Sequence, residues 1–240
     1  MEFKGLKKSS LIEWPEKIVS VAYTGGCNFR CPFCQNKDLV LNPEEIPTIE
    51  GEEVIDHLES KRRWLDGLMI TGGEPTLHSS LPDFCRKVKD DGFEVGVETN
   101  GTRPEMLKEL TEEGLVDYLA IDIKAPLSWN RYKEAIGVDD EELFEKIRTT
   151  LENLQNWNVD YEFRTTVVPG LLDEKDLMKI AEQVKDKTDK YYLQQFIAEN
   201  TLDEKYENVE PFSPEKLKRV RDEIEDYFEI CEIRNLPHES

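Results

Sequence analysis

Three of the five cysteines lie within eight residues, at Cys27, Cys31 and Cys34, with the spacing C-x3-C-x2-C. They follow the apolar run Ile18–Tyr23, which is typical of a buried strand, so we expect the thiols to lie at the edge of a core. Three thiolates in one short loop suit a cubane iron–sulfur cluster whose fourth iron has no protein ligand. Such an open iron can bind and activate a small molecule.

A structural zinc site is the main alternative for these thiols. Zinc takes four ligands, usually in two C-x2-C halves separated by about a dozen residues or more. The other candidate ligands show no such pairing: Cys85, Cys231, His57, His78 and His238. We therefore predict an iron–sulfur cluster on Cys27, Cys31 and Cys34, and we interpret Cys85 and Cys231 as small buried apolar residues.

A glycine-rich element follows a second apolar run, 67–71. Gly72, Gly73 and Glu74 come directly after it, followed by a proline. Because glycine has no side chain, a ligand can approach this backbone closely, and the carbonyl groups can point at a cation. A tight strand-to-helix turn is the alternative interpretation of the same residues.

Polar side chains also end the later apolar runs. They are Glu98, Thr99, Asn100, Asp122, Lys124, Arg164, Thr166, Gln194 and Gln195. A lysine beside an acid is costly to bury unless the two are paired or used, so Asp122 and Lys124 are either a structural pair or part of a site. Strand alternation places Arg164 and Thr166 on one face. The two glutamines could bind a ligand or lie at the edge of the core.

These residues must be positioned by an alternation of strands and helices. The apolar runs predict strands at 18–23, 67–71, 93–99, 116–123, 159–168 and 191–196, with a last extended run at 228–233. The amphipathic stretches predict helices at 51–65, 82–90, 104–114, 140–157, 173–187 and 214–227. Six strand-then-helix units in order indicate a parallel sheet with right-handed crossovers.

The predicted fold is therefore α/β, a partial open (β/α)6 TIM-like barrel with parallel strands. We expect a single domain over residues 1–240, with a core at about 16–200 and a C-terminal helix and strand at about 213–234. A doubly wound open sheet is the alternative. Both folds bind ligands at the carboxyl ends of their strands, where the motifs above fall.

Composition narrows the function further. The formal net charge of −21 argues against binding to nucleic acid, which requires a basic surface. Neither a signal peptide nor a membrane-spanning run is recognisable, so no membrane partner is expected. An odd number of cysteines, three of them clustered, fits a reducing cytoplasm and a metal site better than a disulfide framework.

The cysteine loop resembles the signature of the radical S-adenosylmethionine (SAM) superfamily, C-x3-C-x-aromatic-C, at Cys27, Cys31, Phe33 and Cys34. The resemblance implies one [4Fe–4S] cluster whose open iron chelates SAM, with Phe33 near the adenine. It implies that an electron from the cluster cleaves SAM to methionine and a 5′-deoxyadenosyl radical. It also implies that the Gly72–Glu74 backbone receives the ammonium group of SAM.

The wider sequence resembles one branch of that superfamily, the activating proteins of anaerobic ribonucleoside-triphosphate reductase and other glycyl radical enzymes. The matching stretches are 10–18, 113–118 and 122–127. The branch implies that Asp122, Lys124 and Arg164 contact SAM. From their places at the strand ends, we add Asn100, Thr166 and Gln195 as candidate SAM-binding residues. It implies a glycyl radical enzyme as protein substrate, whose backbone glycine loses hydrogen, and an electron donor such as flavodoxin or ferredoxin.

One departure from the branch leaves alternatives open. Glu98 stands where the branch tends to have aspartate, although Glu98, Thr99 and Asp122 are the residues that the branch implies for a monovalent cation near SAM. The Glu-Thr-Asn-Gly stretch also resembles the radical SAM synthases of 7-carboxy-7-deazaguanine, so a small pterin is an alternative substrate. An iron–sulfur electron-transfer or redox-sensing protein is the alternative from another class.

Overall fold

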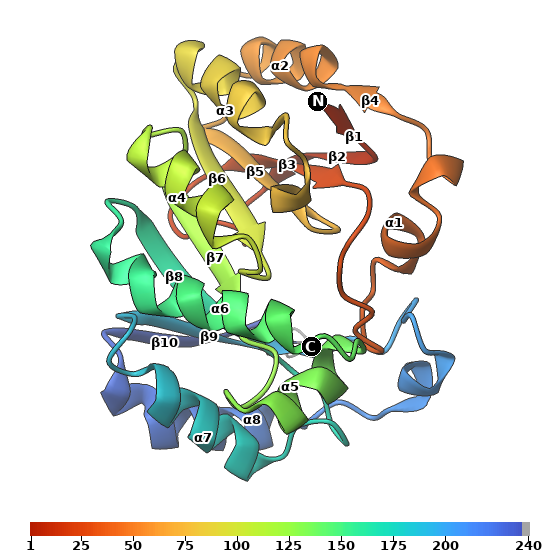
Figure 1. The fold of residues 1–240 in the computed structure, drawn as a ribbon, viewed down its shortest axis with the longest axis vertical. Helices are drawn as coiled ribbons and strands as arrows, with labels where there is room; N and C mark the ends of the chain where they lie inside the picture. Colours follow the sequence, from red (N-terminus) through yellow and green to blue (C-terminus); the bar gives the residue numbers. More distant parts are fainter. Residues whose placement is uncertain (237–240) are drawn as a thin grey trace. The chain divides into compact units, whose positions relative to one another are not determined.

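Strands and helices alternate along residues 1–236, which the computed structural model describes (Figure 1). The strands are β1 (Glu2–Phe3), β2 (Gly5–Ser10), β3 (Val19–Thr24), β4 (Ile49–Glu50), β5 (Gly67–Gly72), β6 (Glu94–Thr99), β7 (Tyr118–Asp122), β8 (Asp160–Val167), β9 (Lys190–Gln195) and β10 (Ile230–Arg234). The α-helices are α1 (Lys37–Leu41), α2 (Gly51–Ser60), α3 (Leu81–Asp90), α4 (Pro104–Glu112), α5 (Trp129–Ile136), α6 (Glu141–Asn153), α7 (Glu174–Val184) and α8 (Pro214–Ile224).

The main sheet is mostly parallel. Its strand order is β10-β9-β8-β7-β6-β5-β3-β2, while β1 pairs with β4 in a separate two-stranded sheet. The pairs β3–β5, β5–β6, β8–β9 and β9–β10 are parallel, and β2 is antiparallel to β3 at one edge. The α/β class and the parallel sheet predicted from the sequence are confirmed.

The chain divides into two compact units. Unit 1 contains Met1–Asn28, Asn36–Ala120 and Asn156–Asp160; unit 2 contains Phe29–Gln35, Ile121–Gln155 and the chain from Tyr161 onward. The cysteine loop is shared, because Cys27 belongs to unit 1 while Cys31 and Cys34 belong to unit 2. The single domain expected over residues 1–240 stays a prediction.

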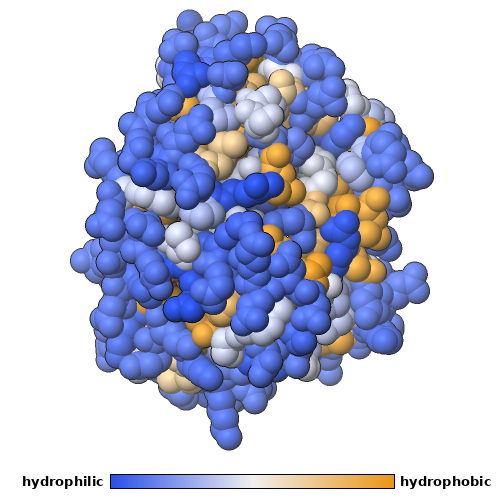
Figure 2. Space-filling view, viewed as in Figure 1, coloured by the Kyte–Doolittle hydropathy of each residue, from blue (hydrophilic) through white to orange (hydrophobic). Residues whose placement is uncertain are grey.

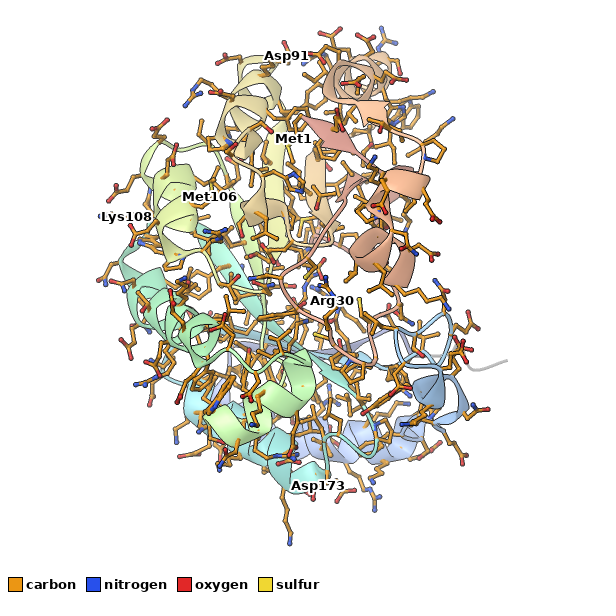
Figure 3. All side chains as sticks on the ribbon, turned by 45° about the vertical axis from the view of Figure 1, so that its right-hand side comes forward. Met1, Arg30, Asp91, Met106, Lys108 and Asp173 are labelled. Atoms are coloured by element: carbon orange, nitrogen blue, oxygen red, sulfur yellow. The ribbon has the colours of Figure 1, made fainter. Side chains whose placement is uncertain are left out.

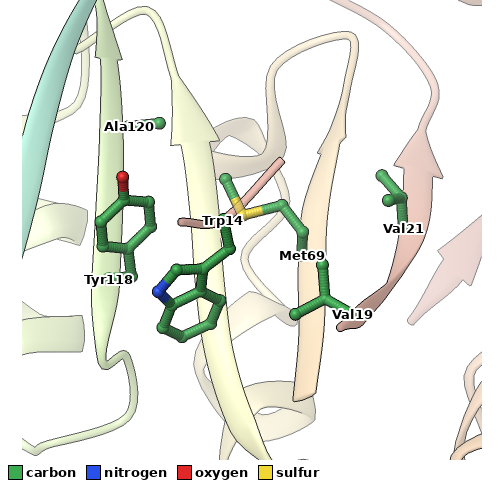
Figure 4. Close-up of a cluster of buried hydrophobic side chains, with 6 residues drawn as sticks. All are labelled: Trp14, Val19, Val21, Met69, Tyr118 and Ala120. Atoms are coloured by element: carbon green, nitrogen blue, oxygen red, sulfur yellow. The ribbon is translucent and has the colours of Figure 1, made fainter. Parts of the chain in front are cut away.

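In unit 1, two stacked aromatic rings belong to a buried hydrophobic cluster that packs against the sheet (Figure 4). The rings of Trp14 and Tyr118 lie 4.9 Å apart and are nearly parallel, at 13°. A Cβ atom on Gly96 would lie 2.7 Å from the sulfur of Met69 and 3.0 Å from the Trp14 ring. Gly96 in β6 therefore makes room for the Trp14 indole. The packing of this cluster holds together strands of unit 1, and the sequence motifs lie at the ends of these strands.

In unit 2, helix ends are built by local signals. The side chain of Asp173, labelled in Figure 3, accepts a hydrogen bond from the Asp176 N–H and starts α7 with a capping box. Helix α5 is capped by Gly137, whose φ of 67° favours glycine, and a Cβ there would lie 2.0 Å from the Arg30 carbonyl oxygen. Helices α7 and α8 lie side by side (Figure 1).

The structure corrects several predicted elements. The helix predicted at 51–65 is wrong in its last turn, since α2 ends at Ser60 and Leu65 is buried outside the helix. Trp64 is 75% exposed, because the charged residues before it offer no apolar face to continue the helix. Helix α5 and the edge strand β2 were not predicted; β2 carries exposed lysines instead of an apolar pattern, as edge strands often do.

Figure 2 shows one face of the molecule, on which hydrophilic residues dominate and hydrophobic residues gather mainly toward the right of the view. Charged residues make up 35% of the chain. No helix within residues 1–236 combines the length and the hydropathy that crossing a bilayer requires.

Candidate active site

The glycine-rich turn of unit 1 lies directly against the first half of the cysteine loop. The Gly73 N–H donates to the Thr24 carbonyl at 2.9 Å, and the Glu74 N–H donates to the Gly26 carbonyl at 2.8 Å. A Cβ atom on Gly73 would lie 1.8 Å from the Gly26 oxygen, which no side chain permits. Gly72 has φ of 116°, a conformation that L side chains rarely adopt. Both glycines are therefore required for this approach of two backbones.

Glu74 joins the end of β5 to the end of β6. Its carboxyl group is buried, with 1% of the residue exposed. Oε1 accepts hydrogen bonds from the Thr76 N–H (3.1 Å), the Thr76 hydroxyl (2.5 Å) and the Thr99 hydroxyl (2.6 Å). Oε2 accepts from the Asn100 N–H at 2.7 Å. Burial raises the pKa of Glu74, and these donors oppose the shift.

The Asn100 side chain faces the first cysteine. Its Nδ2 lies 2.8 Å from the Asn28 Oδ1 and 4.0 Å from the Cys27 sulfur. Thr102 donates to the Asn100 Oδ1 through its N–H (3.0 Å) and its hydroxyl (2.6 Å). Sequence reasoning marked Asn100 and Cys27 but missed Asn28 and Thr102, whose position beside a marked residue was the available signal.

The predicted monovalent-cation site stays a prediction. The Thr99 hydroxyl donates to Glu74 and accepts from the Gly101 N–H at 3.1 Å, and the Thr71 hydroxyl donates to Glu98 at 3.3 Å. Among residues 1–236, no three histidine, cysteine, aspartate or glutamate side chains gather around one ion position. A cubane cluster does not need such a group, because its ligands bind different irons.

In unit 2, the second half of the cysteine loop is held by backbone hydrogen bonds. The N–H of Arg30, which Figure 3 labels, donates to the Ile136 carbonyl at 2.8 Å. The Asp203 N–H donates to Pro32 at 2.8 Å, and the Leu202 N–H donates to Cys34 at 2.9 Å. The segment after β9 therefore positions the thiol-bearing turn, and nothing in its sequence pattern had indicated this.

Asp122, Lys124 and Phe33 come together in unit 2. The Lys124 ammonium lies 2.9 Å from the Asp122 carboxylate and 5.9 Å from the centroid of the Phe33 ring. Burial alone lowers the pKa of Lys124, but the charges of Asp122 and Cys31 outweigh it and hold that pKa well above its ordinary value. The buried Tyr132, which sequence reasoning missed, accepts a hydrogen bond from the Lys124 N–H at 3.3 Å.

Arg164 belongs to a buried ionic group. Its Nε donates to Glu162, whose carboxylate also receives both terminal nitrogens of Arg234, at 2.5 and 2.9 Å. Arg164 is 1% and Glu162 0% exposed. The Arg164 guanidinium group, which was predicted to bind a ligand, therefore already uses its Nε for Glu162 within unit 2. Alternation along β8 could have indicated Glu162, but its link to Arg234 depends on strand pairing.

The two glutamines of β9 lie on opposite faces. Register pairs Thr166 with Gln194, and their side chains lie 3.4 Å apart, on the face of Arg164. Gln195 lies on the other face, where its Nε2 donates to the Phe212 carbonyl at 2.8 Å. Its buried Oε1 has no hydrogen-bond partner among the described residues. The structure therefore favours Gln194, rather than Gln195, as the neighbour of Arg164 and Thr166.

The remaining candidate metal ligands are accounted for within residues 1–236. None of the five cysteines forms a disulfide, and Cys85 and Cys231 are buried, as predicted for small apolar residues. His57 Nε2 lies 3.2 Å from the Lys8 carbonyl oxygen, and His78 Nε2 lies 2.9 Å from that of Gly25. His238 lies outside the described residues. The thiols of Cys27, Cys31 and Cys34 fit the cluster by donor chemistry, because thiolates are its usual ligands.

Comparison with known proteins identifies the family. The model of the radical SAM superfamily matches residues 21–184. A protein of Methanocaldococcus jannaschii, provisionally named a glycyl-radical enzyme activating enzyme, is 34% identical over 235 residues, covering 97% of this chain and 95% of its own. A second protein of that organism with the same provisional name is 29% identical and covers 75% of this chain and 67% of its own.

Solved structures agree on the fold. SuiB of Streptococcus suis, bound to S-adenosylmethionine, superposes with a TM-score of 0.70 at 13% identity, covering 90% of this chain and 49% of SuiB. Escherichia coli coproporphyrinogen III oxidase, a radical SAM enzyme, has a TM-score of 0.59 at 15% identity, covering 90% of this chain and 54% of the oxidase. This chain thus spans about half of these neighbours.

The chain belongs to the radical SAM superfamily and is a radical SAM enzyme. Its fold is the partial (β/α)6 barrel of that superfamily, as the sequence predicted. Its cofactors are a [4Fe–4S] cluster and S-adenosylmethionine.

Proposed function

We propose that this enzyme is an activase that takes a hydrogen atom from a backbone glycine of a partner glycyl radical enzyme. The observation that carries the proposal is the similarity, over nearly the full length of both chains, to a protein provisionally named a glycyl-radical enzyme activating enzyme. The finer proposal, that the partner is anaerobic ribonucleoside-triphosphate reductase, is supported by the resemblance of residues 10–18, 113–118 and 122–127 to its activating proteins.

The cofactors supply the chemistry: when bound, the cluster provides an electron that cleaves SAM to methionine and a 5′-deoxyadenosyl radical. We assign the cluster to Cys27, Cys31 and Cys34, on their spacing and thiolate chemistry. The protein must orient the reacting atoms and exclude water, because a radical reacts with the first hydrogen it meets. No side-chain acid or base is needed for hydrogen-atom abstraction.

In unit 1, the glycine-rich turn is our candidate for binding the ammonium group of SAM. Gly72 and Gly73 are partly exposed, so their backbone is within reach of a ligand, while the space that a Cβ atom would need is taken by the Thr24 and Gly26 backbones. Glu74 contributes by holding the turn, since its four hydrogen bonds all join it to Thr76, Thr99 and Asn100.

In unit 2, Lys124, Arg164 and Thr166 are our candidates for contacting SAM. The Asp122 carboxylate supports the Lys124 charge at 2.9 Å, and Phe33 lies next to that ammonium group. Glu162 holds one edge of the Arg164 guanidinium, which orients the planar group for a carboxylate. Gln194 adds an amide on the face of Thr166. The Gln195 Oε1, which has no hydrogen-bond partner within residues 1–236, could accept a hydrogen bond on the other face.

One anaerobic experiment tests the proposed function. The wild type and Cys31→Ala are reconstituted with iron and sulfide, reduced, mixed with SAM, and assayed for 5′-deoxyadenosine. We expect product from the wild type alone, and Cys85→Ala, which changes a buried cysteine outside the motif, serves as the matched control. A fully reduced wild-type cluster that makes no 5′-deoxyadenosine contradicts our SAM-cleavage mechanism.

The partner is tested separately. Purified anaerobic ribonucleotide reductase or another glycyl radical enzyme is added, and EPR spectroscopy records whether a glycyl radical appears. Loss of that signal when the target glycine is replaced by alanine supports direct abstraction. Product formation from SAM without a glycyl radical on any candidate, but with turnover of a carboxylated tetrahydropterin, would replace the activase proposal. We also propose a cytoplasmic location and a flavodoxin or ferredoxin as electron donor.

A further inference from the structure

Three side chains of unit 1 form a closed ring of hydrogen bonds beside Cys27. The Thr102 hydroxyl donates to the Asn100 Oδ1 (2.6 Å), the Asn100 Nδ2 donates to the Asn28 Oδ1 (2.8 Å), and the Asn28 Nδ2 donates to the Thr102 hydroxyl (2.8 Å). Each group donates once and accepts once around the ring. Hydrogen bonds in such a chain polarise one another, which strengthens the donors.

The orientation of the Asn100 amide is set by the backbone. The Thr102 N–H is only a donor, and it points at the Asn100 Oδ1 at 3.0 Å. The oxygen and nitrogen of this amide therefore cannot be exchanged without placing two donors face to face. The Asn100 N–H is in turn bound to the buried Glu74, so the residue is held at both ends.

This arrangement leaves the second amide hydrogen of Asn100 available to the first cysteine. The Asn100 Nδ2 carries two hydrogens; one is used by Asn28, and the Cys27 sulfur lies 4.0 Å from the same nitrogen. Asn100 is 5% exposed and Thr102 is fully buried, so water competes little for this donor. Only one of the two hydrogens on the Asn100 Nδ2 takes part in the ring of hydrogen bonds.

We propose that Asn100 is a positioning residue that donates an N–H···S hydrogen bond to the cluster-bound Cys27 thiolate and thereby raises the reduction potential of the cluster. Reduction adds negative charge to the cluster and its sulfur ligands. A fixed donor stabilises that charge more in the reduced state than in the oxidised state. The inference depends on the cluster alone, not on the proposed partner.

The test is a redox titration of the reconstituted, full-length protein in the absence of SAM. The midpoint potential is followed by the EPR signal of the reduced cluster in the wild type, Asn100→Leu and Asn100→Asp. We expect Asn100→Leu to be harder to reduce by about tenfold in the equilibrium constant, equivalent to about 59 mV for one electron. Asn100→Asp should shift further in the same direction, because it places a carboxylate oxygen where the donor was.

Two further variants distinguish a specific effect on the reduction potential of the cluster from a general disturbance of the structure. Thr102→Val breaks the ring at the hydroxyl but keeps the Thr102 N–H, so its midpoint should fall between those of the wild type and Asn100→Leu. Asn153→Leu makes the same change on an exposed face of α6 and should titrate as the wild type. Iron and sulfide contents are measured for every variant.

A wild-type midpoint in Asn100→Leu with full cluster content overturns the proposal. If that variant fails to take up the cluster, Asn100→Asp carries the same test, because it keeps an oxygen acceptor for the Thr102 N–H. A wild-type midpoint in Asn100→Asp would then overturn the proposal as well.

Discussion

Both carboxylate oxygens of Glu74 accept hydrogen bonds from neighbouring residues. Oε1 accepts from the Thr76 N–H and Oε2 accepts from the Asn100 N–H, in addition to two hydroxyl donors. Backbone donors cannot rotate away or become acceptors, so this site discriminates a carboxyl group from an amide. The residue therefore holds the ends of β5 and β6 in one geometry beside the cysteine loop.

Glu74→Gln should destabilise the protein by about 1–3 kcal/mol, because the new NH2 group must face a backbone N–H on one side or the other. The measurement is urea unfolding of the protein without cluster, followed by circular dichroism. Glu112→Gln, on the exposed surface of α4, is the matched control and should unfold like the wild type. Equal stability of Glu74→Gln and wild type would show that the carboxyl group is not required.

The pH dependence of the same variant tests the burial of Glu74. Burial raises the folded-state pKa of this acid, so the folded state holds its proton more tightly than the unfolded state does. The stability that protonated Glu74 adds to the folded state is fully present below the pKa that Glu74 has in the unfolded state. It is lost as pH rises through the pKa that Glu74 has in the folded state. Wild-type stability should therefore fall over that window, and the fall should be absent in Glu74→Gln. A wild-type curve that rises with pH relative to the variant contradicts this sign.

The turn after β5 works as an element because two backbones meet there without side chains. Gly73 lies where any Cβ would overlap the Gly26 oxygen, at 1.8 Å, and the Glu74 N–H bonds that same oxygen. The turn and the first half of the cysteine loop therefore form one rigid arrangement. A substitution that moves the backbone of one of these segments should therefore displace the backbone of the other.

Gly73→Ala should greatly reduce cluster uptake, because the added methyl group pushes the Gly26 backbone, and Cys27 with it, out of place. Bound iron and sulfide per chain after anaerobic reconstitution measure this. Gly114→Ala is the control: Gly114 has φ of 64°, and an added Cβ would meet no atom within 4 Å, so only backbone strain of about 1 kcal/mol is added. Normal cluster content in Gly73→Ala would mean that the loop adapts.

Strand β10 is tied into unit 2 through Arg234, which gives both terminal nitrogens to Glu162 and lies 3.6 Å above the Tyr192 ring. Arg234→Met should destabilise the protein by about 1.5–3 kcal/mol, since the buried Glu162 loses a charged donor while Arg164 remains. Thermal unfolding measures the change. Arg148→Met, which removes a surface pair on α6, should leave the melting temperature near that of the wild type. If both variants melt alike, the buried group adds little.

The whole chain carries a net charge of −21, and acidic residues outnumber basic ones by 52 to 31. Such an excess repels itself in the folded state more than in the expanded unfolded state. Raising KCl from about 0.01 M to 0.15 M shortens the Debye length from about 30 Å to 8 Å, so we expect the melting temperature to rise over this range and then level off. A melting temperature that is flat or falls would show that ion pairs offset the repulsion.

Much of the fold and the chemistry could be predicted from the chain alone. The spacing of Cys27, Cys31 and Cys34 is a property of the covalent chain, and the alternation of strands and helices follows from local periodicity. Both can therefore be predicted from the sequence. Local signals also have limits. Helix α2 stops at Ser60 because no apolar face continues it, and the edge strand β2 has too little pattern to be recognised.

Contacts between distant positions had to come from the tertiary structure. Asn28 and Asn100 are 72 positions apart, and Glu162 and Arg234 are likewise 72 apart, yet each pair shares hydrogen bonds. Which of Gln194 and Gln195 shares a face with Arg164 depends on the register of β8 and β9. Sequence periodicity fixes how one element is built, but only strand register and packing bring side chains from different elements within hydrogen-bond distance.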